Sequence, residues 1–144
     1  MTLPKIAQLE FPEQPVQKST TTTVHKTLAW DFEVGDFKLS DGKTIVVSGI
    51  EYIKIWIQKA LRTVKNSRIY VGTQYGSEHH SLIGRNFKPA FSQAEYERMI
   101  REALLQNNAI LRVERFVFST NESRLSIQFD VTSIYSTTTE QVVI

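Results

Sequence analysis

Glu78, His79 and His80 are the residues of this chain whose types and spacing could do chemistry. Carboxylate and imidazole groups together are typical ligands of zinc. Adjacent histidines in an extended segment point to opposite sides, however, and cannot easily reach one metal ion. The helical His-Glu-x-x-His pattern is absent, and the third histidine, His25, lies in the N-terminal part. The sequence therefore predicts surface histidines near a turn and no metal site.

The sequence also gives little support for two kinds of hydrolase site that could include Glu78. A glycoside hydrolase needs a second acid at a defined separation, and no other acid is singled out by its setting. The order Ser77-Glu78-His79 contains the residue types of a triad, but triads depend on geometry, and no Gly-x-Ser-x-Gly pattern is present. The sequence predicts no catalytic residue. A peptidoglycan hydrolase with Glu78 as its acid stays open as an alternative.

Composition removes several other classes of function. Gly72, Gly76 and Gly84 fit neither nucleotide-binding glycine pattern, so no cofactor is expected. The chain has no cysteine, and 17 basic against 15 acidic residues leave a net charge of +2, too small for a nucleic-acid partner. No window approaches the roughly 18 apolar residues of a membrane span, and no signal peptide is evident. We expect a soluble protein made in the cytoplasm.

The N-terminal half predicts strands followed by a helix. Residues 27–37 favour a strand, and the Asp-Gly pair within Ser40–Lys43 predicts a hairpin turn. Ser48 and Glu51 have the spacing of a capping box, which predicts that a helix begins at Ser48. The apolar residues that then recur on one helical face are Ile50, Ile53, Trp56, Ile57, Ala60 and Leu61.

The C-terminal half predicts a second helix and two long strands. A short strand is expected from Arg68, then a turn at Tyr75-Gly76. Ser92 and Glu95 again have capping-box spacing, and Asn107-Asn108 is expected to end this second helix. The two strands expected after it are residues 110–118 and 124–135, and Leu125, Ile127, Phe129, Val131 and Tyr135 share the buried face of the second.

These elements predict an α+β fold, with a small mixed sheet and two helices packed on one of its faces. Residues 1–26 hold three of the four prolines and a Ser-Thr run, which indicates either a disordered tail or an extended arm lying on a neighbouring subunit. Residues 27–135 form the domain. Residues 136–144 end in Gln141-Val142-Val143-Ile144, a β-prone tail that could pair with the sheet edge of another chain.

A mixed-charge face is expected on the two long strands. Its members are Arg112, Glu114, Arg115 and Arg124. Such a face is either solvated or part of a protein interface, where arginine is favoured for directional pairing with carboxylates.

The stretch from Arg68 to Gly84 also resembles part of a known family. The motifs that carry the resemblance are Thr63, Arg68-Ile69-Tyr70, Tyr75-Gly76-Ser77-Glu78 and Leu82-Ile83-Gly84, with Leu28 to Glu33, Gly35-Asp36-Phe37 and Ser48 to Glu51 upstream. They are similar to the baseplate wedge, or sheath-initiator, proteins of contractile-tailed phages, over about residues 27 to 135. The most similar branch is that of Bacillus-type phages and defective prophages. Members of the wider family have been labelled lysozyme-like.

The resemblance implies a structural protein without catalysis, present in six copies in the tail baseplate of a virion or phage-like particle. Its implied partners are baseplate wedge proteins, the tail sheath protein, and tube or hub proteins. It would start sheath assembly by exchanging β-strands with the first sheath ring. The residues expected to take part in interactions are Arg68, Tyr75, Gly76, Glu78, Asn107, Asn108, Arg112, Gln141, Val142, Val143 and Ile144. A freestanding adaptor that binds peptides along a sheet edge is a further alternative.

The chain departs from the family pattern after the second helix. Many relatives carry an acidic-Pro-Arg or acidic-acidic-Arg triplet there, which contacts a helical bundle of the wedge. The matching positions in this chain read Asn107-Asn108-Ala109, so the acids and the arginine are missing. Arg112 is the nearest arginine that could replace the lost contact.

Overall fold

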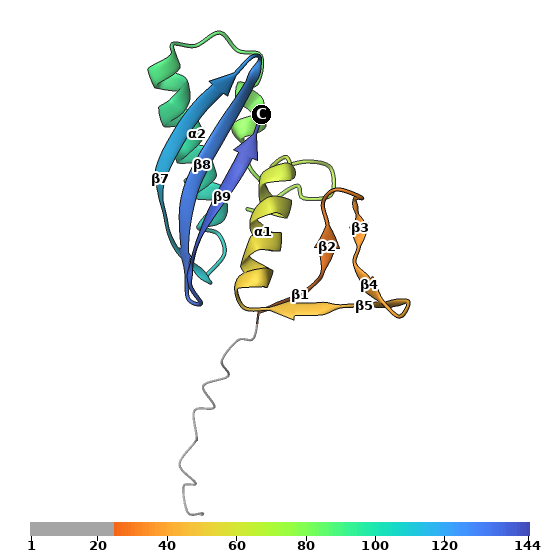
Figure 1. Ribbon diagram of the computed structural model, residues 1–144. Helices are drawn as coiled ribbons and strands as arrows, with labels where there is room; N and C mark the ends of the chain where they lie inside the picture. The colour runs from red at the N-terminus through yellow and green to blue at the C-terminus, as the bar shows by residue number, and fades with distance from the viewer. Residues whose placement is uncertain (1–24) are drawn as a thin grey trace, which may run out of the picture.

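The computed structural model of the protein describes residues 25–144 (Figure 1). The predicted α+β class is confirmed, with helices and several small antiparallel sheets in one chain. The arm expected over residues 1–26 lies almost wholly outside the described residues, which begin at His25. Within that described part, neither α-helix has the length and apolar character needed to cross a membrane.

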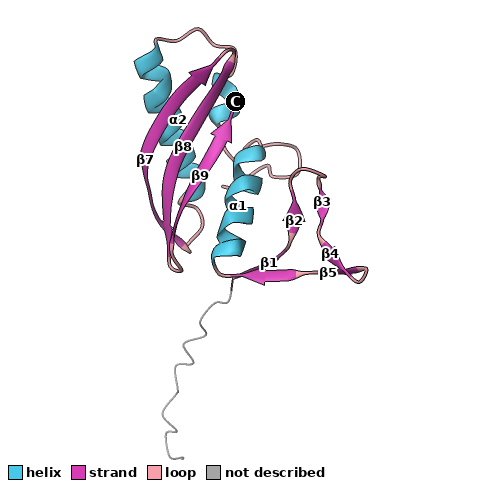
Figure 2. Ribbon diagram, viewed as in Figure 1, coloured by secondary structure: helices cyan, strands magenta, loops and turns pink. Residues whose placement is uncertain are grey.

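A three-stranded antiparallel sheet forms the C-terminal half. It consists of β7 (Ile110–Asn121), β8 (Arg124–Ser133) and β9 (Thr137–Val143), in that order. As predicted, α1 (Ile50–Arg62) and α2 (Pro89–Leu104) pack on one face of this sheet (Figure 2). The expectation of a single mixed sheet is wrong, because the N-terminal strands pair with one another in three separate antiparallel sheets.

The hydrophobic core lies between this sheet face and the two helices. Alternate residues of β8 point inward, and Phe129, Ile127 and Val131 are fully buried there. The helix residues that meet them are Ile53, Ile57 and Leu61 of α1 and Ile100 and Leu104 of α2. Burying each such side chain stabilises the fold by about 1.5–3 kcal/mol. The apolar residues that recur at helical and strand spacing in the sequence therefore form the core.

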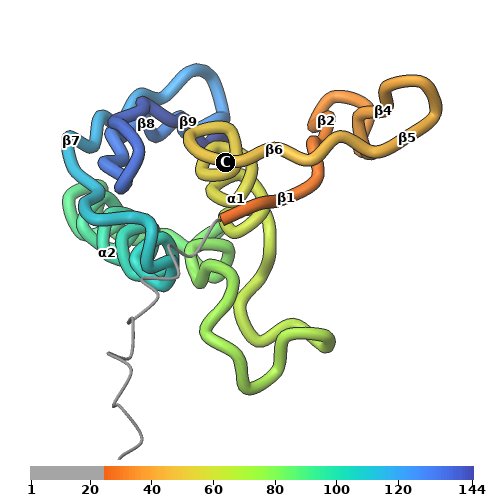
Figure 3. The backbone as a smooth tube through the Cα atoms, turned by 90° about the horizontal axis from the view of Figure 1, so that it is seen from below, coloured from red at the N-terminus to blue at the C-terminus, as the bar shows by residue number. Residues whose placement is uncertain are grey.

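The segment 26–48 forms a lobe of paired short strands, here called the hairpin lobe. It extends from the body on the side away from α2 and the three-stranded sheet (Figure 3). Its paired strands are β1 (Lys26–Leu28) with β6 (Val46–Ser48), β2 (Trp30–Asp31) with β3 (Asp36–Phe37), and β4 (Leu39–Ser40) with β5 (Lys43–Thr44). The predicted hairpin turn is confirmed, because Asp41 and Gly42 both have positive φ, 51° and 74°, as two-residue hairpin turns require.

The single strand predicted over residues 27–37 is broken by a turn. The carboxylate of Asp31 accepts hydrogen bonds from the backbone N–H groups of Glu33 at 2.9 Å and Val34 at 3.2 Å. These local bonds compete with the extended ladder. Gly35 completes the turn with a φ of 77°. The chain therefore folds back on itself between β2 and β3.

Helix α1 begins two residues later than predicted. Ser48 belongs to β6 and pairs with Lys26, so its side chain makes no cap hydrogen bond. Gly49 is the N-cap residue, with a φ of 66° that glycine adopts without strain. The strand pairing of Ser48 has displaced the expected capping box.

Helix α2 begins three residues earlier than predicted. Pro89 is its first residue, and its fixed φ and missing N–H suit that position. Ser92 is already inside the helix, where its N–H donates to the carbonyl of Lys88. The apolar residues that recur on one face of this helix are buried: Tyr96, Met99, Ile100, Ala103 and Leu104.

Residues 68–74 form successive turns in place of the predicted short strand. The N–H of Tyr70 donates to the carbonyl of Ser67, and the N–H of Thr73 to that of Tyr70. Ile69 and Val71 are 86% and 69% exposed. Their β-propensity does not produce a strand, because no strand among residues 25–144 pairs with this segment.

The connection between β7 and β8 is tighter than the expected five-residue loop. β7 continues to Asn121, and Glu122 enters the turn with a φ of 54°. At the other end, β8 stops at Ser133, so Tyr135 is 41% exposed and does not share the buried face as predicted.

Among the glycines of residues 68–84, here called the central stretch, Gly76 has the closest backbone neighbours. Its conformation confirms the predicted turn. Its φ is 100°, and a Cβ placed there would lie 2.9 Å from both the Lys65 nitrogen and the Thr63 carbonyl oxygen. The next residue, Ser77, donates its N–H to Thr63 at 2.9 Å and accepts from the Lys65 N–H at 3.2 Å. A side chain at position 76 would break this crossing of two backbone segments, residues 63–65 and 76–80, which together are called the corner.

The Gly76→Ala variant is expected to lose about 2–5 kcal/mol of unfolding free energy, because the methyl group adds backbone overlap to left-handed strain. Gly84→Ala is the matched control, since Gly84 has a φ of 78° but open space around its Cβ position. We expect the control to lose about 1–2 kcal/mol. Urea unfolding followed by circular dichroism measures both, and equal losses would contradict the backbone contact.

Candidate interaction surface

The two histidines of the central stretch, His79 and His80, lie side by side in a short helical turn. They lie on η1 (His79–Leu82), a 3₁₀ turn, and their rings are adjacent with centroids 4.0 Å apart. The expectation that they point to opposite sides is therefore wrong. His79 is only 3% exposed, which also corrects its prediction as a surface residue. No group of three or more potential ligands able to hold a metal lies within residues 25–144.

Ser77 and His79 form a buried hydrogen-bonded pair. The Ser77 Oγ lies 2.6 Å from the His79 Nδ1, and Ser77 is 1% exposed. Burial lowers the pKa of His79 from 6.5 to about 4, with a smaller contribution from His80. A serine beside an imidazole is the start of a triad, but the acid of the motif, Glu78, faces elsewhere. The pair is buried, with Ser77 and His79 1% and 3% exposed.

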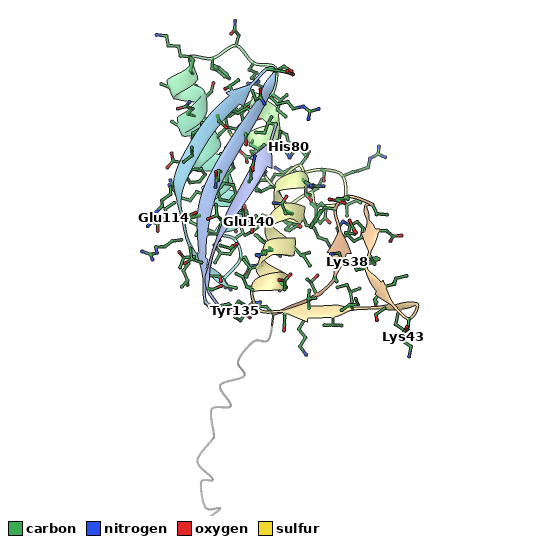
Figure 4. The ribbon with its side chains drawn as sticks, viewed as in Figure 1. Lys38, Lys43, His80, Glu114, Tyr135 and Glu140 are labelled. Carbon is green, nitrogen blue, oxygen red and sulfur yellow. The ribbon has the colours of Figure 1, made fainter. Side chains whose placement is uncertain are left out.

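His80 caps the C-terminal end of α1. Its Nε2 lies 2.9 Å from the carbonyl oxygen of Leu61, so the Nε2 carries the proton and donates it. The last carbonyls of a helix have no partner within the helix, and a donor side chain satisfies one of them. Figure 4 shows His80 beside this end of α1. The sequence pattern alone had no signal for this contact.

Glu78 is tied to a lysine that the sequence analysis missed. The Lys65 Nζ lies 3.2 Å from Glu78 and 3.7 Å from Glu102 on α2. The lysine thus stands between two half-exposed carboxylates and joins the corner to α2. Only the fold reveals this role, because Glu102 is far from both partners in the sequence.

Tyr75 packs in an aromatic group on the outside of the corner. Its ring centroid lies 5.0 Å from that of Tyr70 and 6.0 Å from that of Trp56. Partial burial raises the pKa of Tyr75. Arg68 is exposed on the neighbouring turn. Both residues remain predicted interaction residues.

Helix α2 ends at Leu104 and not at Asn107-Asn108 as predicted, and these two asparagines have different surroundings. Asn107 is buried, its Oδ1 accepts from the Ala109 N–H at 3.0 Å, and its Nδ2 donates to the Tyr52 hydroxyl at 3.0 Å. It therefore links α1 to the start of β7. Asn108 and Arg112 are exposed and stay available as the predicted wedge contact.

The C-terminal tail is the third strand of the sheet. β9 begins at Thr137, four residues before the β-prone tetrapeptide that starts at Gln141, and pairs with β8 over its whole length. Val142 is buried against the core, and Ile144 exchanges both backbone hydrogen bonds with Leu125, at 2.8 and 3.0 Å. In this structure the tail therefore completes its own sheet.

The outer edge of β9 has no strand partner among the described residues. Antiparallel pairs alternate, so the residues next to a hydrogen-bonded pair turn their backbone groups to the other side. Because Ile144 bonds inward, the N–H and C=O groups of Val143, Gln141 and Thr139 point outward. Gln58 on α1 donates to the Gln141 carbonyl at 3.4 Å. We missed Gln58 because it lies on the polar face of its helix.

A cavity of about 270 Å³ lies beside this outer edge. Its lining comes from the second half of α1, from the two histidines and from the last residues of β9: Gln58, Leu61, Arg62, His79, His80, Gln141, Val142 and Val143. The labels of Glu140 on β9 and of His80 in Figure 4 help to locate this part of the molecule. An extended chain laid along β9 would pass over this cavity.

The opposite edge of the sheet is less suited to strand addition. β7 has two register shifts, between Ile110 and Arg112 and between Glu114 and Val117. Arg115 has a φ of 57° in the second, and Arg101 donates to the Val113 carbonyl at 3.2 Å. Bulges protect sheet edges from pairing. The mixed-charge face on β7 and β8 carries one long ion pair, at 3.5 Å between Arg115 and Asp130.

The buried state of His79 predicts how stability depends on pH. The unfolded protein binds a proton near pH 6.5 and the folded protein only near pH 4, so the unfolded state is favoured as the pH falls through this window. We expect a loss of up to about 3 kcal/mol between pH 6.5 and 4. Urea midpoints across this range measure it. The His79→Gln variant should lose clearly less over the same range, and an identical slope in both proteins would contradict the assignment.

Comparison with known proteins adds two findings. The contractile injection system sheath initiator family matches residues 26–136. A crystal structure of a protein from Geobacter sulfurreducens, described as a proposed tail lysozyme, is similar with a TM-score of 0.55 and 20% identity. The match covers 69% of this chain and 94% of that one. At this identity the likeness concerns the fold alone. No protein with a curated description matches. The chain belongs to the contractile injection system sheath initiator family.

Proposed function

We propose that the protein is a non-catalytic baseplate component that starts the tail sheath by accepting β-strands from the first sheath ring. Family membership makes it a tail component of a contractile injection system. The observation that carries the finer proposal is the unpaired outer edge of β9. Backbone hydrogen bonds along such an edge supply affinity, and adjacent pockets supply register.

The arrangement of β9 supports acceptance of a strand more than donation of the tail. Donation would remove Val142 from the core and release the pairing of β9 with β8. Acceptance leaves Val142 in the core and β9 paired with β8. The incoming strand would bond only to the backbone N–H and C=O groups that point outward from β9. The same proposal includes six copies in a ring. They would dock on wedge proteins, with tube or hub proteins nearby. Asn108 and Arg112 are its exposed candidates for the wedge contact.

A single outward N–H tests this proposal. Val143→Pro removes the backbone donor that faces the incoming strand, and Val143→Ala keeps it. Baseplates assembled with the proline variant should carry few or no sheaths, whereas the alanine variant should give sheaths of normal length. Negative-stain electron microscopy of particles measures both. Circular dichroism establishes that both variants fold, and normal sheaths on baseplates that contain folded Val143→Pro protein would refute the acceptor edge.

Glu78 is proposed to act as an ion-pair partner and not as a catalytic acid. Its carboxylate is held in an ion pair, 3.2 Å from the Lys65 ammonium. Purified protein is therefore expected to give no decrease in the turbidity of a cell-wall suspension, and Glu78→Gln should behave like the unchanged protein. Lysis that the variant abolishes would instead establish a peptidoglycan hydrolase.

The adaptor alternative differs from this proposal in its partners. A sheath initiator should gain mass when it is mixed with wedge proteins, whereas a freestanding adaptor should not. Native mass spectrometry of the protein alone and with wedge proteins separates the two.

A further inference from the structure

The hairpin lobe and α1 enclose an apolar cavity apart from the core. Its volume is about 420 Å³, within the range of pockets that hold small ligands and side chains. Ala29 and Ile55 are buried there, 6% and 8% exposed, although neither belongs to the main core cluster. Trp30, Phe32, Ile45 and Val47 complete its apolar lining. The lobe thus has a second, partly open apolar surface.

Basic side chains outnumber acidic ones in the lining of this cavity. Lys38 and Lys54 line it together with one acid, Glu51, and none of the three forms an ion pair within residues 25–144. In the adjoining cavity, the Lys59 ammonium lies 4.8 Å from the Trp30 ring and the Arg62 guanidinium 4.7 Å from the Phe32 ring. An occupant with apolar side chains and carboxylates would match this surface.

The chain itself contains such a segment outside the described residues. Residues 9–13 read Leu-Glu-Phe-Pro-Glu, with two apolar side chains and two carboxylates. Proline disfavours helical backbone at the residue before it, so Phe11 is biased towards the extended form that a groove accepts. We propose that residues 9–13 bind in the cavity between the hairpin lobe and α1 of the same chain, with Phe11 as the apolar anchor.

The distances allow this contact within one molecule. The described chain starts at His25, whose ring stacks on Tyr52 of α1 at 5.4 Å, one helical turn from Ile55. The eleven residues between Glu13 and His25 can extend over about 36 Å, and α1 is only about 20 Å long. A tether of this length holds the segment at millimolar effective concentration, so a weak contact is well occupied. The bound segment would brace the lobe against α1.

Disulfide trapping in the full chain tests the proposal, because the protein has no cysteine of its own. Gln14→Cys places a thiol next to the segment, and Val47→Cys places one in the cavity wall. Val46→Cys is the matched control. It is the neighbouring strand residue, equally within reach of the tether, and successive strand residues face opposite sides. Under mild oxidation we expect the Val47 pair to form an intramolecular disulfide about five times faster or more than the Val46 pair.

A third substitution tests the anchor. Phe11→Ala, added to the Val47 pair, should reduce the trapping rate to near that of the Val46 pair, whereas Leu3→Ala should leave it unchanged. Thermal unfolding of each reduced variant establishes that the fold is kept. Equal rates for the two valine positions would overturn the proposal. A disulfide-linked dimer would also overturn it and would indicate that a second copy supplies the segment.

Discussion

The crossing of two backbone segments at Gly76 is the constraint on which the arrangement of the helices depends. Position 76 approaches the backbone of Thr63 and Lys65 so closely that a Cβ has no room. This approach lets Ser77 hydrogen-bond to the segment that leaves α1, and it brings His80 to the last carbonyls of that helix. The corner consequently sets where α1 ends and where the chain turns towards α2.

The polar groups of the corner are used for structure. His79 shares a hydrogen bond with Ser77 and is kept neutral by burial, His80 caps a helix, and Glu78 pairs with Lys65. Every buried side-chain nitrogen or oxygen among residues 25–144 has a hydrogen-bond partner. Buried polar groups whose hydrogen bonds are all satisfied make the surrounding structure rigid. A protein of the sheath initiator family fits this use of histidine and serine.

Two exposed features of the fold border α1. One is the regular outer edge of β9 beside a small cavity, and the other is the apolar cavity under the hairpin lobe. Both use α1 as a wall, because Gln58 lines both cavities and Ile55 also lines the one under the hairpin lobe. Since the corner at Gly76 and His80 positions this helix, it also positions both surfaces relative to each other.

The sequence by itself determined the apolar stripes of both helices, the alternation of Ile127, Phe129 and Val131, and the Asp41-Gly42 turn, because these depend on local periods and backbone preferences. The family resemblance was also readable from local motifs. Only the tertiary structure decided the burial of His79, the partners of Glu78 and Asn107, and the pairing of the tail with β8. Each of these depends on a residue far away in the chain, such as Lys65, Tyr52 or Leu125. No local pattern encodes such a neighbour.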